Sequence, residues 1–168
     1  MTLTLKATFH SSMRILLSTA LMLGATAAVP AVATKAVAPD FTLRTMEGPN
    51  LRLQEQRGRV VLVNFWATWC GPCKAEIPGF VELQAKYKDD LVIVGFSVDD
   101  PADKAKAFAA EYKMNYPILL GEGREDVQES YGPIWGIPAS FLISKDGKVC
   151  RKHLGIAPTS VFEKEIVA

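Results

Sequence analysis

Two cysteines in a short aromatic segment offer the clearest chemistry in this sequence of 168 residues. The segment follows an apolar run, precedes a helical pattern, and reads Phe65-Trp66-Ala67-Thr68-Trp69-Cys70-Gly71-Pro72-Cys73-Lys74. Cysteines three positions apart on a first helical turn face the same way, so their Cα atoms can approach the roughly 5.5 Å that a disulfide requires. This spacing predicts a disulfide that opens and closes.

A metal site is the rival interpretation of the same pair. A closed zinc site takes four ligands, commonly a second pair of cysteines or histidines at similar spacing. Beyond the pair, the sequence offers only Cys150, His10 and His153. We therefore expect redox chemistry with no metal and no cofactor. A disulfide that closes so small a loop removes little entropy from the unfolded chain, so the pair is better explained as reactive than as structural.

The junction of strand and helix indicates different roles for the two cysteines. Unpaired backbone N–H groups and the positive end of the helix dipole favour a thiolate at Cys70. Cys73 lies one turn deeper and is expected to be the resolving thiol. Between them, Gly71 lets a partner backbone come close, and Pro72 has a fixed φ and no backbone donor near the helix start.

Composition predicts one globular domain behind an N-terminal leader. The chain is 49% hydrophobic with a net charge of +1 and has no long basic run, so nucleic acid is not an expected partner. Residues 15–33 carry no charge and end in small residues, which indicates a signal peptide cleaved after Ala33. This peptide has ordinary proportions if translation starts at Met13 rather than at Met1. The alternative is an inner-membrane anchor, because the segment approaches the roughly 20 residues that span a bilayer. Either form places the domain in a periplasmic or extracytoplasmic, disulfide-permissive space.

Alternating strand and helix patterns follow a linker at residues 34–38 and predict a domain over 39–168. A hairpin is expected around the turn at 47–50, and the apolar runs at 60–66 and 91–97 are typical of strands buried on both faces. The remaining expected elements are helices at 70–88, kinked at Pro78, 102–112, 125–131 and 158–167, and a hairpin of strands 140–143 and 148–152. The pattern predicts an α/β fold with a central mixed sheet, helices on both faces and an N-terminal hairpin extension.

Three stretches of the chain resemble exported thioredoxin-like reductases of the TlpA/ResA type. They read VNFWATWCGPC at 63–73, KAEIP at 74–78 and GIPASFLI at 136–143, and the likeness runs in motif order over about residues 38–168. The opening APDFTL at 38–43 is shared with peroxiredoxins. The resemblance implies a thioredoxin fold, an exposed nucleophile at Cys70, a resolving Cys73 and a cis peptide bond before Pro138.

Proton transfer at Cys73 is expected to involve Glu76. Cytosolic thioredoxins carry a buried aspartate at the strand position that Asn64 occupies here, and an amide cannot titrate in its place. Glu76 follows Cys73 by three residues and is its helical neighbour, and the resemblance implies an active-site role for it. Partial burial would raise its pKa and let it shuttle the proton of Cys73. The alternative is a solvated glutamate on the helix face.

Substrate binding is expected at the rim around the cysteine pair. A cis bond at Pro138 would place backbone groups of Ile137 opposite Cys70, where an extended substrate segment could pair as an added strand. Gly71 and Pro72 would lie against the same segment.

Aromatic residues and the third cysteine have more than one interpretation. Alternation sends Trp66 into the core and leaves Trp69 beside the rim as a substrate contact, whereas Trp135 suits the rim and the core equally. Cys150 is expected to be an inert, buried thiol, with intermolecular pairing as the alternative. His153 is expected at the surface.

These observations favour a thiol-disulfide oxidoreductase in which Cys70 attacks a substrate disulfide and Cys73 releases the product. The resemblance implies a reductase whose client is the cysteine pair of an apocytochrome c, with electrons from a membrane thiol donor. One alternative is a Cu(I) delivery module held by the two thiolates. A thiol peroxidase is disfavoured, because Ala67 and Val63 stand where a peroxidase would carry Thr and Pro.

Overall fold

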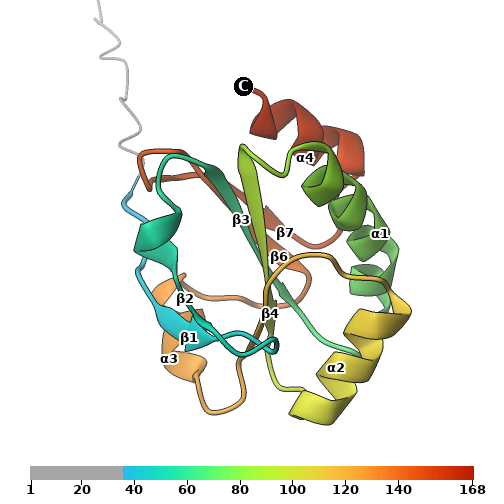
Figure 1. Ribbon diagram of the computed structural model, residues 1–168. Coiled ribbons are helices and arrows are strands. Elements are labelled where there is room, and N and C mark those ends of the chain that lie inside the picture. The colour runs from blue at the N-terminus through green and yellow to red at the C-terminus, as the bar shows by residue number, and fades with distance from the viewer. Residues whose placement is uncertain (1–35) are drawn as a thin grey trace, which may run out of the picture. The chain divides into compact units, whose positions relative to one another are not determined.

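The computed structural model describes residues 36–168, and the predicted leader with its cleavage after Ala33 lies outside the described residues. Figure 1 shows the described elements in chain order. They are β1 (Thr42–Arg44), β2 (Asn50–Arg52), the 3-10 turn η1 (Leu53–Gln56), β3 (Val60–Trp66), α1 (Gly71–Lys86), β4 (Leu91–Ser97), α2 (Ala102–Glu111), β5 (Ile118–Leu120), α3 (Glu125–Ser130), β6 (Ala139–Ile143), β7 (Val149–Leu154) and α4 (Thr159–Ile166). Among residues 36–168, no helix is both long and apolar enough to cross a membrane.

A five-stranded mixed sheet in the order β5-β4-β3-β6-β7 forms the centre of the domain. β3 pairs in parallel with β4 and antiparallel with β6, and β7 continues the antiparallel side. The apolar runs at 60–66 and 91–97 lie in its interior as expected, because strands covered on both faces can bury nearly every side chain.

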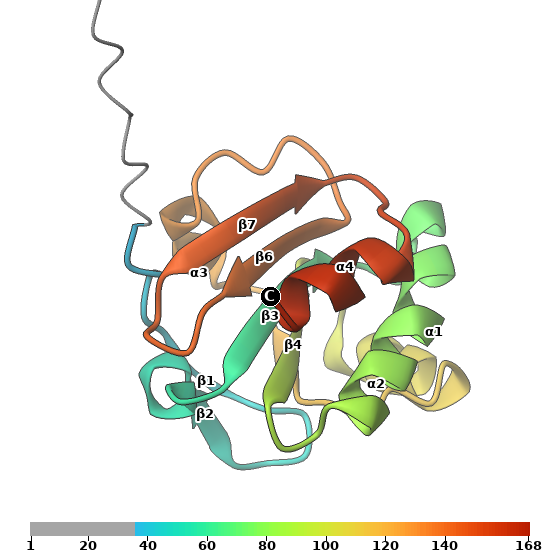
Figure 2. The ribbon, with the colours of Figure 1, turned by 90° about the horizontal axis from the view of Figure 1, so that it is seen from above.

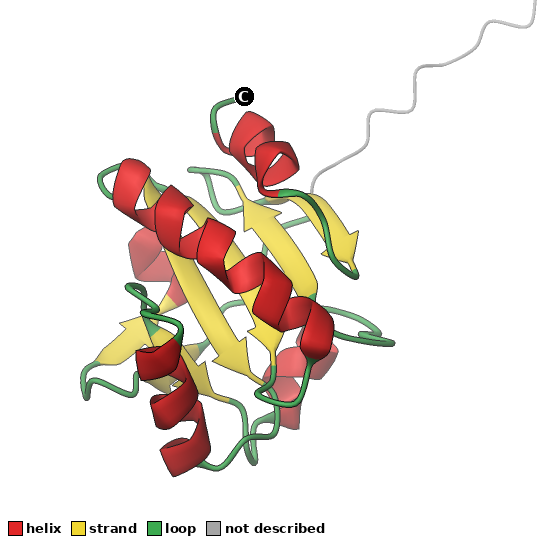
Figure 3. Ribbon diagram, turned by 90° about the vertical axis from the view of Figure 1, so that its right-hand side faces the viewer, coloured by secondary structure: helices red, strands yellow, loops and turns green. Residues whose placement is uncertain are grey.

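Alternation along β3 divides its side chains between two apolar layers. Val61, Val63 and Phe65 pack with the β1–β2 hairpin and with residues of α3. Leu62 and Trp66 pack on the opposite face, with residues of α1, α2 and α4. Figure 2 shows the sheet between these layers, and Figure 3 shows α1 lying across the second face. The predicted α/β class, mixed sheet, two-sided helical cover and N-terminal hairpin are confirmed.

The helices begin and end close to the expected positions. Pro101 is the N-cap residue of α2, and β7 extends to Leu154, beyond the predicted end at residue 152. Pro78 lies inside α1, and the kink there stays a prediction.

Gly79 lets α4 approach α1 closely. A Cβ atom at this position would overlap Oγ1 of Thr159, the first residue of α4, and would meet the Cβ of Thr159 at 3.0 Å. Glycine weakens a helix interior, so its presence in the middle of α1 has a packing cause.

Replacing Gly79 with Ala should lower the free energy of unfolding by about 1–3 kcal/mol, because the short Thr159 side chain cannot move aside without shifting α4. Denaturant unfolding measures the change. Gly136→Ala is the control, since a Cβ there would enter open space. Equal stability of the two variants would contradict the packing explanation.

Candidate active site

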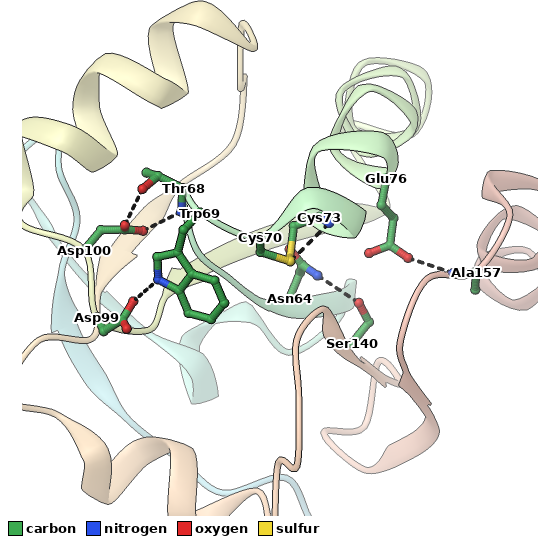
Figure 4. Close-up of a disulfide and its surroundings, with 10 residues drawn as sticks. All are labelled: Asn64, Thr68, Trp69, Cys70, Cys73, Glu76, Asp99, Asp100, Ser140 and Ala157. Atoms are coloured by element: carbon green, nitrogen blue, oxygen red, sulfur yellow. Dashed lines mark hydrogen bonds between the residues drawn. A yellow bond between two sulfur atoms is a disulfide. The ribbon is translucent and has the colours of Figure 1, made fainter.

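The end of β3 and the start of α1 place the two cysteines side by side (Figure 4). Cys70 is the N-cap of α1 with extended backbone angles, and its Sγ accepts a hydrogen bond from the Cys73 N–H at 3.2 Å. The two sulfur atoms form a disulfide, with Cα atoms 5.3 Å apart. The sulfur of Cys70 therefore lies at the helix end where backbone N–H groups stabilise an anion.

Both cysteines are buried in this oxidised form. Cys70 is 3% exposed and belongs to the same apolar cluster as Cys73 and Ile77. The expectation of an exposed nucleophile is wrong for the disulfide state, because Cys70 packs inside this cluster at the base of α1.

Two acidic residues after β4 hold the loop that leads to Cys70. The carboxylate of Asp100 is buried and accepts hydrogen bonds from the Thr68 N–H at 2.9 Å and the Thr68 hydroxyl at 2.5 Å. The Ser97 hydroxyl also donates to Asp100, at 2.6 Å. Trp69 donates from Nε1 to Asp99 at 3.0 Å, while its side chain remains 64% exposed.

Sequence reasoning missed Asp99 and Asp100. The available signal was their place directly after the strand at 91–97, since the carboxyl ends of parallel neighbours meet at one edge of a sheet.

The cis peptide bond expected before Pro138 is present. Ile137 packs against the cluster that contains both cysteines, and the Gly155 N–H donates to the Pro138 carbonyl at 2.8 Å. Trp135, three residues earlier, is 88% exposed, so the core interpretation of this residue is wrong. Trp66 is fully buried, as alternation predicted.

Asn64 lies beneath α1 as a buried, non-titrating group. Its Nδ2 donates to the Ser140 hydroxyl at 3.0 Å across the antiparallel pair of β3 and β6. Figure 4 shows this amide beside the cysteine pair.

Glu76 is 4% exposed, so the alternative of a solvated glutamate is wrong. The helix turns this position toward the segment before α4, where its Oε1 accepts a hydrogen bond from the Ala157 N–H at 3.1 Å. Its Oε2 is buried with no hydrogen-bond partner among residues 36–168. Burial raises the pKa of Glu76 to about 7, and the Ala157 N–H and the charge of His153 oppose this rise.

The remaining cysteine and histidine lie outside the immediate surroundings of the disulfide. Cys150 is a half-buried free thiol that donates to the Leu142 carbonyl at 3.2 Å. His153 is not the surface residue expected, because its ring packs against Phe162 and its Nε2 lies 2.8 Å from Glu165. Over the described part of the chain, no group of three or more His, Cys, Asp or Glu side chains is arranged to hold a metal ion.

The arrangement can accept and donate two electrons. In the oxidised form the pair is a disulfide, and in the reduced form it would supply one thiol favoured as an anion and a second thiol one turn away. Glu76 lies on the next turn with a pKa suited to proton exchange near neutral pH.

Comparison with known proteins gives a consistent result. The AhpC/TSA family matches residues 34–152. The thiol-disulfide oxidoreductase ResA of Bacillus cereus is 38% identical over 120 residues, which cover 70% of this chain and 68% of that protein. The thioredoxin-like protein YneN of Bacillus subtilis is 33% identical over 132 residues, or 77% of this chain and 76% of that protein.

A solved structure supports the fold. The thiol:disulfide interchange protein of the thioredoxin family from Chlorobium tepidum superposes with a TM-score of 0.74 at 28% identity and covers 80% of this chain and 96% of that chain. With a central mixed sheet, helices on both faces and a Cys70–Cys73 disulfide at the start of α1, the chain belongs to the AhpC/TSA family and, within it, to the thioredoxin-like thiol-disulfide oxidoreductases of the ResA type.

Proposed function

We propose that Cys70 is the nucleophile and Cys73 the resolving thiol of a protein-disulfide reductase. The Cys70 thiolate attacks one sulfur of a substrate disulfide and expels the other as a thiolate. The Cys73 thiolate then attacks the Cys70 sulfur, which releases the second substrate thiol and leaves the Cys70–Cys73 disulfide. Two electrons pass to the substrate. The observation that carries this assignment is the place of Cys70 as N-cap of α1.

The proposed proton acceptor for Cys73 is Glu76. Its burial and its position one turn along α1 support this role, because a carboxyl with a pKa of about 7 is ionised often enough to accept a proton near neutral pH.

The proposed substrate site consists of Trp69, Gly71, Pro72, Ile137 and Pro138. Trp69 is exposed and held in place by Asp99, and the cis bond before Pro138 turns the chain where Ile137 packs on the cysteine cluster. An extended substrate segment could pair with this backbone as an added strand.

The proposed client is the cysteine pair of an apocytochrome c, with electrons from a membrane thiol donor. The proposed location is periplasmic or extracytoplasmic, with residues 39–168 as the working domain behind a linker at 34–38. The leader and the resemblance to the TlpA/ResA type support both statements.

A Cys73→Ala variant should accumulate mixed disulfides on Cys70, because the thiol that releases the substrate is missing. Expression in the native host, trapping with acid and mass spectrometry would identify the adducts. Cys150→Ala on the same background should trap equally, and Cys70→Ala should trap nothing. Apocytochromes among the adducts would support the proposed client, and adducts through Cys150 alone would contradict the scheme.

A Glu76→Gln variant should resolve mixed disulfides about tenfold or more slowly at pH 8 and should lose the inflection near pH 7, because the proton acceptor is absent. Single-turnover kinetics across pH 5–9 measure both effects. Glu82→Gln provides the control, since Glu82 lies on the same helix and is exposed. A profile for Glu76→Gln that matches the control would refute the role.

Stability should depend on pH through the same group. The pKa of Glu76 in the folded protein lies above the ordinary value of 4.5 for a glutamate, so folding favours the protonated form. The stabilisation is complete below pH 4.5 and is lost as pH rises through about 7. The unfolding free energy of the wild type should therefore fall over this range by roughly 2 kcal/mol relative to Glu76→Gln. Parallel pH profiles of the two proteins in urea unfolding would contradict this expectation.

A further inference from the structure

The turn that leads from β3 into α1 is bound at both of its central residues. It is closed by a hydrogen bond from the Cys70 N–H to the Ala67 carbonyl at 3.1 Å, so Thr68 and Trp69 lie at its centre. Each of these two residues is bound by a carboxylate that follows β4 (Figure 4). Positions 67–70 contain none of the residue types that dominate turns, namely Gly, Pro, Asn, Asp and Ser. The contacts from outside the turn therefore have a large part in fixing its conformation.

Asp100 binds the backbone of this turn as well as a side chain. It is 3% exposed, and its Oδ2 accepts hydrogen bonds from the Thr68 N–H at 2.9 Å and the Ser97 hydroxyl at 2.6 Å. Its Oδ1 accepts from the Thr68 hydroxyl at 2.5 Å. The N–H of the first central residue has no partner within a turn, so Asp100 also satisfies a backbone donor. Asp99, by contrast, binds only the indole Nε1 of Trp69.

Cys70 is restrained mainly from the side of the turn. The residue that follows it is Gly71, where a Cβ would enter open space, and glycine permits a wide range of backbone angles. In the oxidised form the bond to Cys73 restrains Cys70 as well, but the reduced form lacks that bond. Together with the packing of Cys70 in its apolar cluster, the turn then has to keep the two sulfur atoms within reach of each other.

We propose that Asp100 is a positioning residue for the cysteine pair: by fixing the turn before Cys70, it holds the two thiols of the reduced form where they can close the disulfide. Groups held close together react far more readily than the same groups on a flexible segment, because little freedom is left to lose. The three hydrogen bonds of Asp100 go to Thr68 and Ser97, so it acts through the turn and not on a sulfur. The proposal rests on the redox chemistry proposed for Cys70 and Cys73.

The same restraint acts in the mixed disulfide. There Cys70 is bonded to the substrate, and the Cys73 thiolate must attack the Cys70 sulfur to release the product. A loosened turn would let Cys70 move away together with the substrate. Loss of the anchor should therefore slow product release.

The equilibrium with glutathione measures the effect without any protein substrate. The reduced pair and oxidised glutathione give the Cys70–Cys73 disulfide and two molecules of reduced glutathione, so two electrons pass to glutathione. In the full chain with Cys150→Ala, which removes the third thiol, Asp100→Ala should lower the constant for this closure about tenfold, because the turn loses its anchor. Alkylation of quenched mixtures followed by mass spectrometry measures the constant.

Two further variants separate positioning from other effects of the carboxylate. Asp100→Asn should keep the constant of the wild type, because an amide can still accept from the Thr68 N–H and donate to the Thr68 hydroxyl. Ser97→Ala is the matched control, since it removes a hydrogen bond from the same buried carboxylate and leaves both bonds to Thr68 in place. An unchanged constant in Asp100→Ala, or an equal fall in either of the other two variants, would overturn the proposal.

Thr68→Val provides a second variant if Asp100→Ala does not fold. It removes the hydroxyl that donates to Oδ1 of Asp100 and keeps the backbone hydrogen bond, so the constant should fall about threefold. Thr68→Ser retains the hydroxyl and should keep the constant of the wild type. An unchanged constant in Thr68→Val would contradict the proposal.

The anchor itself has a separate readout. In the reduced full chain, hydrogen exchange of the Cys70 amide, which closes the turn on Ala67, should be about tenfold faster in Asp100→Ala than in the wild type and unchanged in Ser97→Ala. Faster exchange with an unchanged glutathione constant would show that Asp100 fixes the turn without positioning the pair, and would overturn the proposal. The reductase function fails on a different observation, the absence of protein-disulfide reduction by the wild type, which leaves the glutathione constants of the variants unaffected.

Discussion

The packing of α1 across the centre of the sheet is the constraint on which the site depends. Ile77, Phe80 and Leu83 are buried on one side of this helix, and burial of each such side chain contributes about 1.5–3 kcal/mol. This stripe fixes the rotation of the helix about its axis. The rotation in turn directs Cys73 and Glu76 toward the sheet and leaves the N-cap Cys70 at its edge. A helix of weaker packing could place the same cysteines without giving Glu76 a defined environment.

The proton chemistry proposed for this site depends on a buried carboxyl, Glu76 on α1, and on an amide, Asn64, in the strand beneath that helix. Asn64 occupies the strand position beneath the helix, and its Nδ2 donates a hydrogen bond to the Ser140 hydroxyl. Because its side chain is an amide, it contributes a dipole but no charge. The titrating group instead comes from the helix itself, where desolvation raises the pKa of Glu76 to about 7. The carboxyl of Glu76 projects from α1 and is bound by the Ala157 N–H before α4, whereas Asn64 lies in the middle of the sheet between β4 and β6. The proposed proton acceptor of Cys73 is therefore held in part by the C-terminal segment.

Most of the fold and the centre of the site could be predicted from the sequence, because local patterns determine them. The continuous apolar runs of β3 and β4 and the spacing of Cys70 and Cys73 depend only on neighbouring residues. The place of Asp100 directly after a strand indicates the edge of the sheet, but its partner Thr68 and the partial burial of His153 depend on which strands become neighbours, which residue spacing does not contain. The exposed nucleophile was wrongly expected for a related reason, since burial of a sulfur depends on the whole cluster around it.

The order of the strands explains why distant segments meet at one disulfide. β3 delivers the cysteine pair, and its antiparallel neighbour β6 begins directly after cis Pro138, so the proline loop must lie at the same edge. β7 runs antiparallel to β6 and therefore ends at that edge too, where the Gly155 N–H binds the Pro138 carbonyl and the Ala157 N–H binds Glu76. The segment after β7 thus contacts both the proposed substrate loop and the buried carboxyl. Because the two N–H donors are only two residues apart, one short segment fixes the cis-proline loop and the carboxyl of Glu76 at the same end of the sheet.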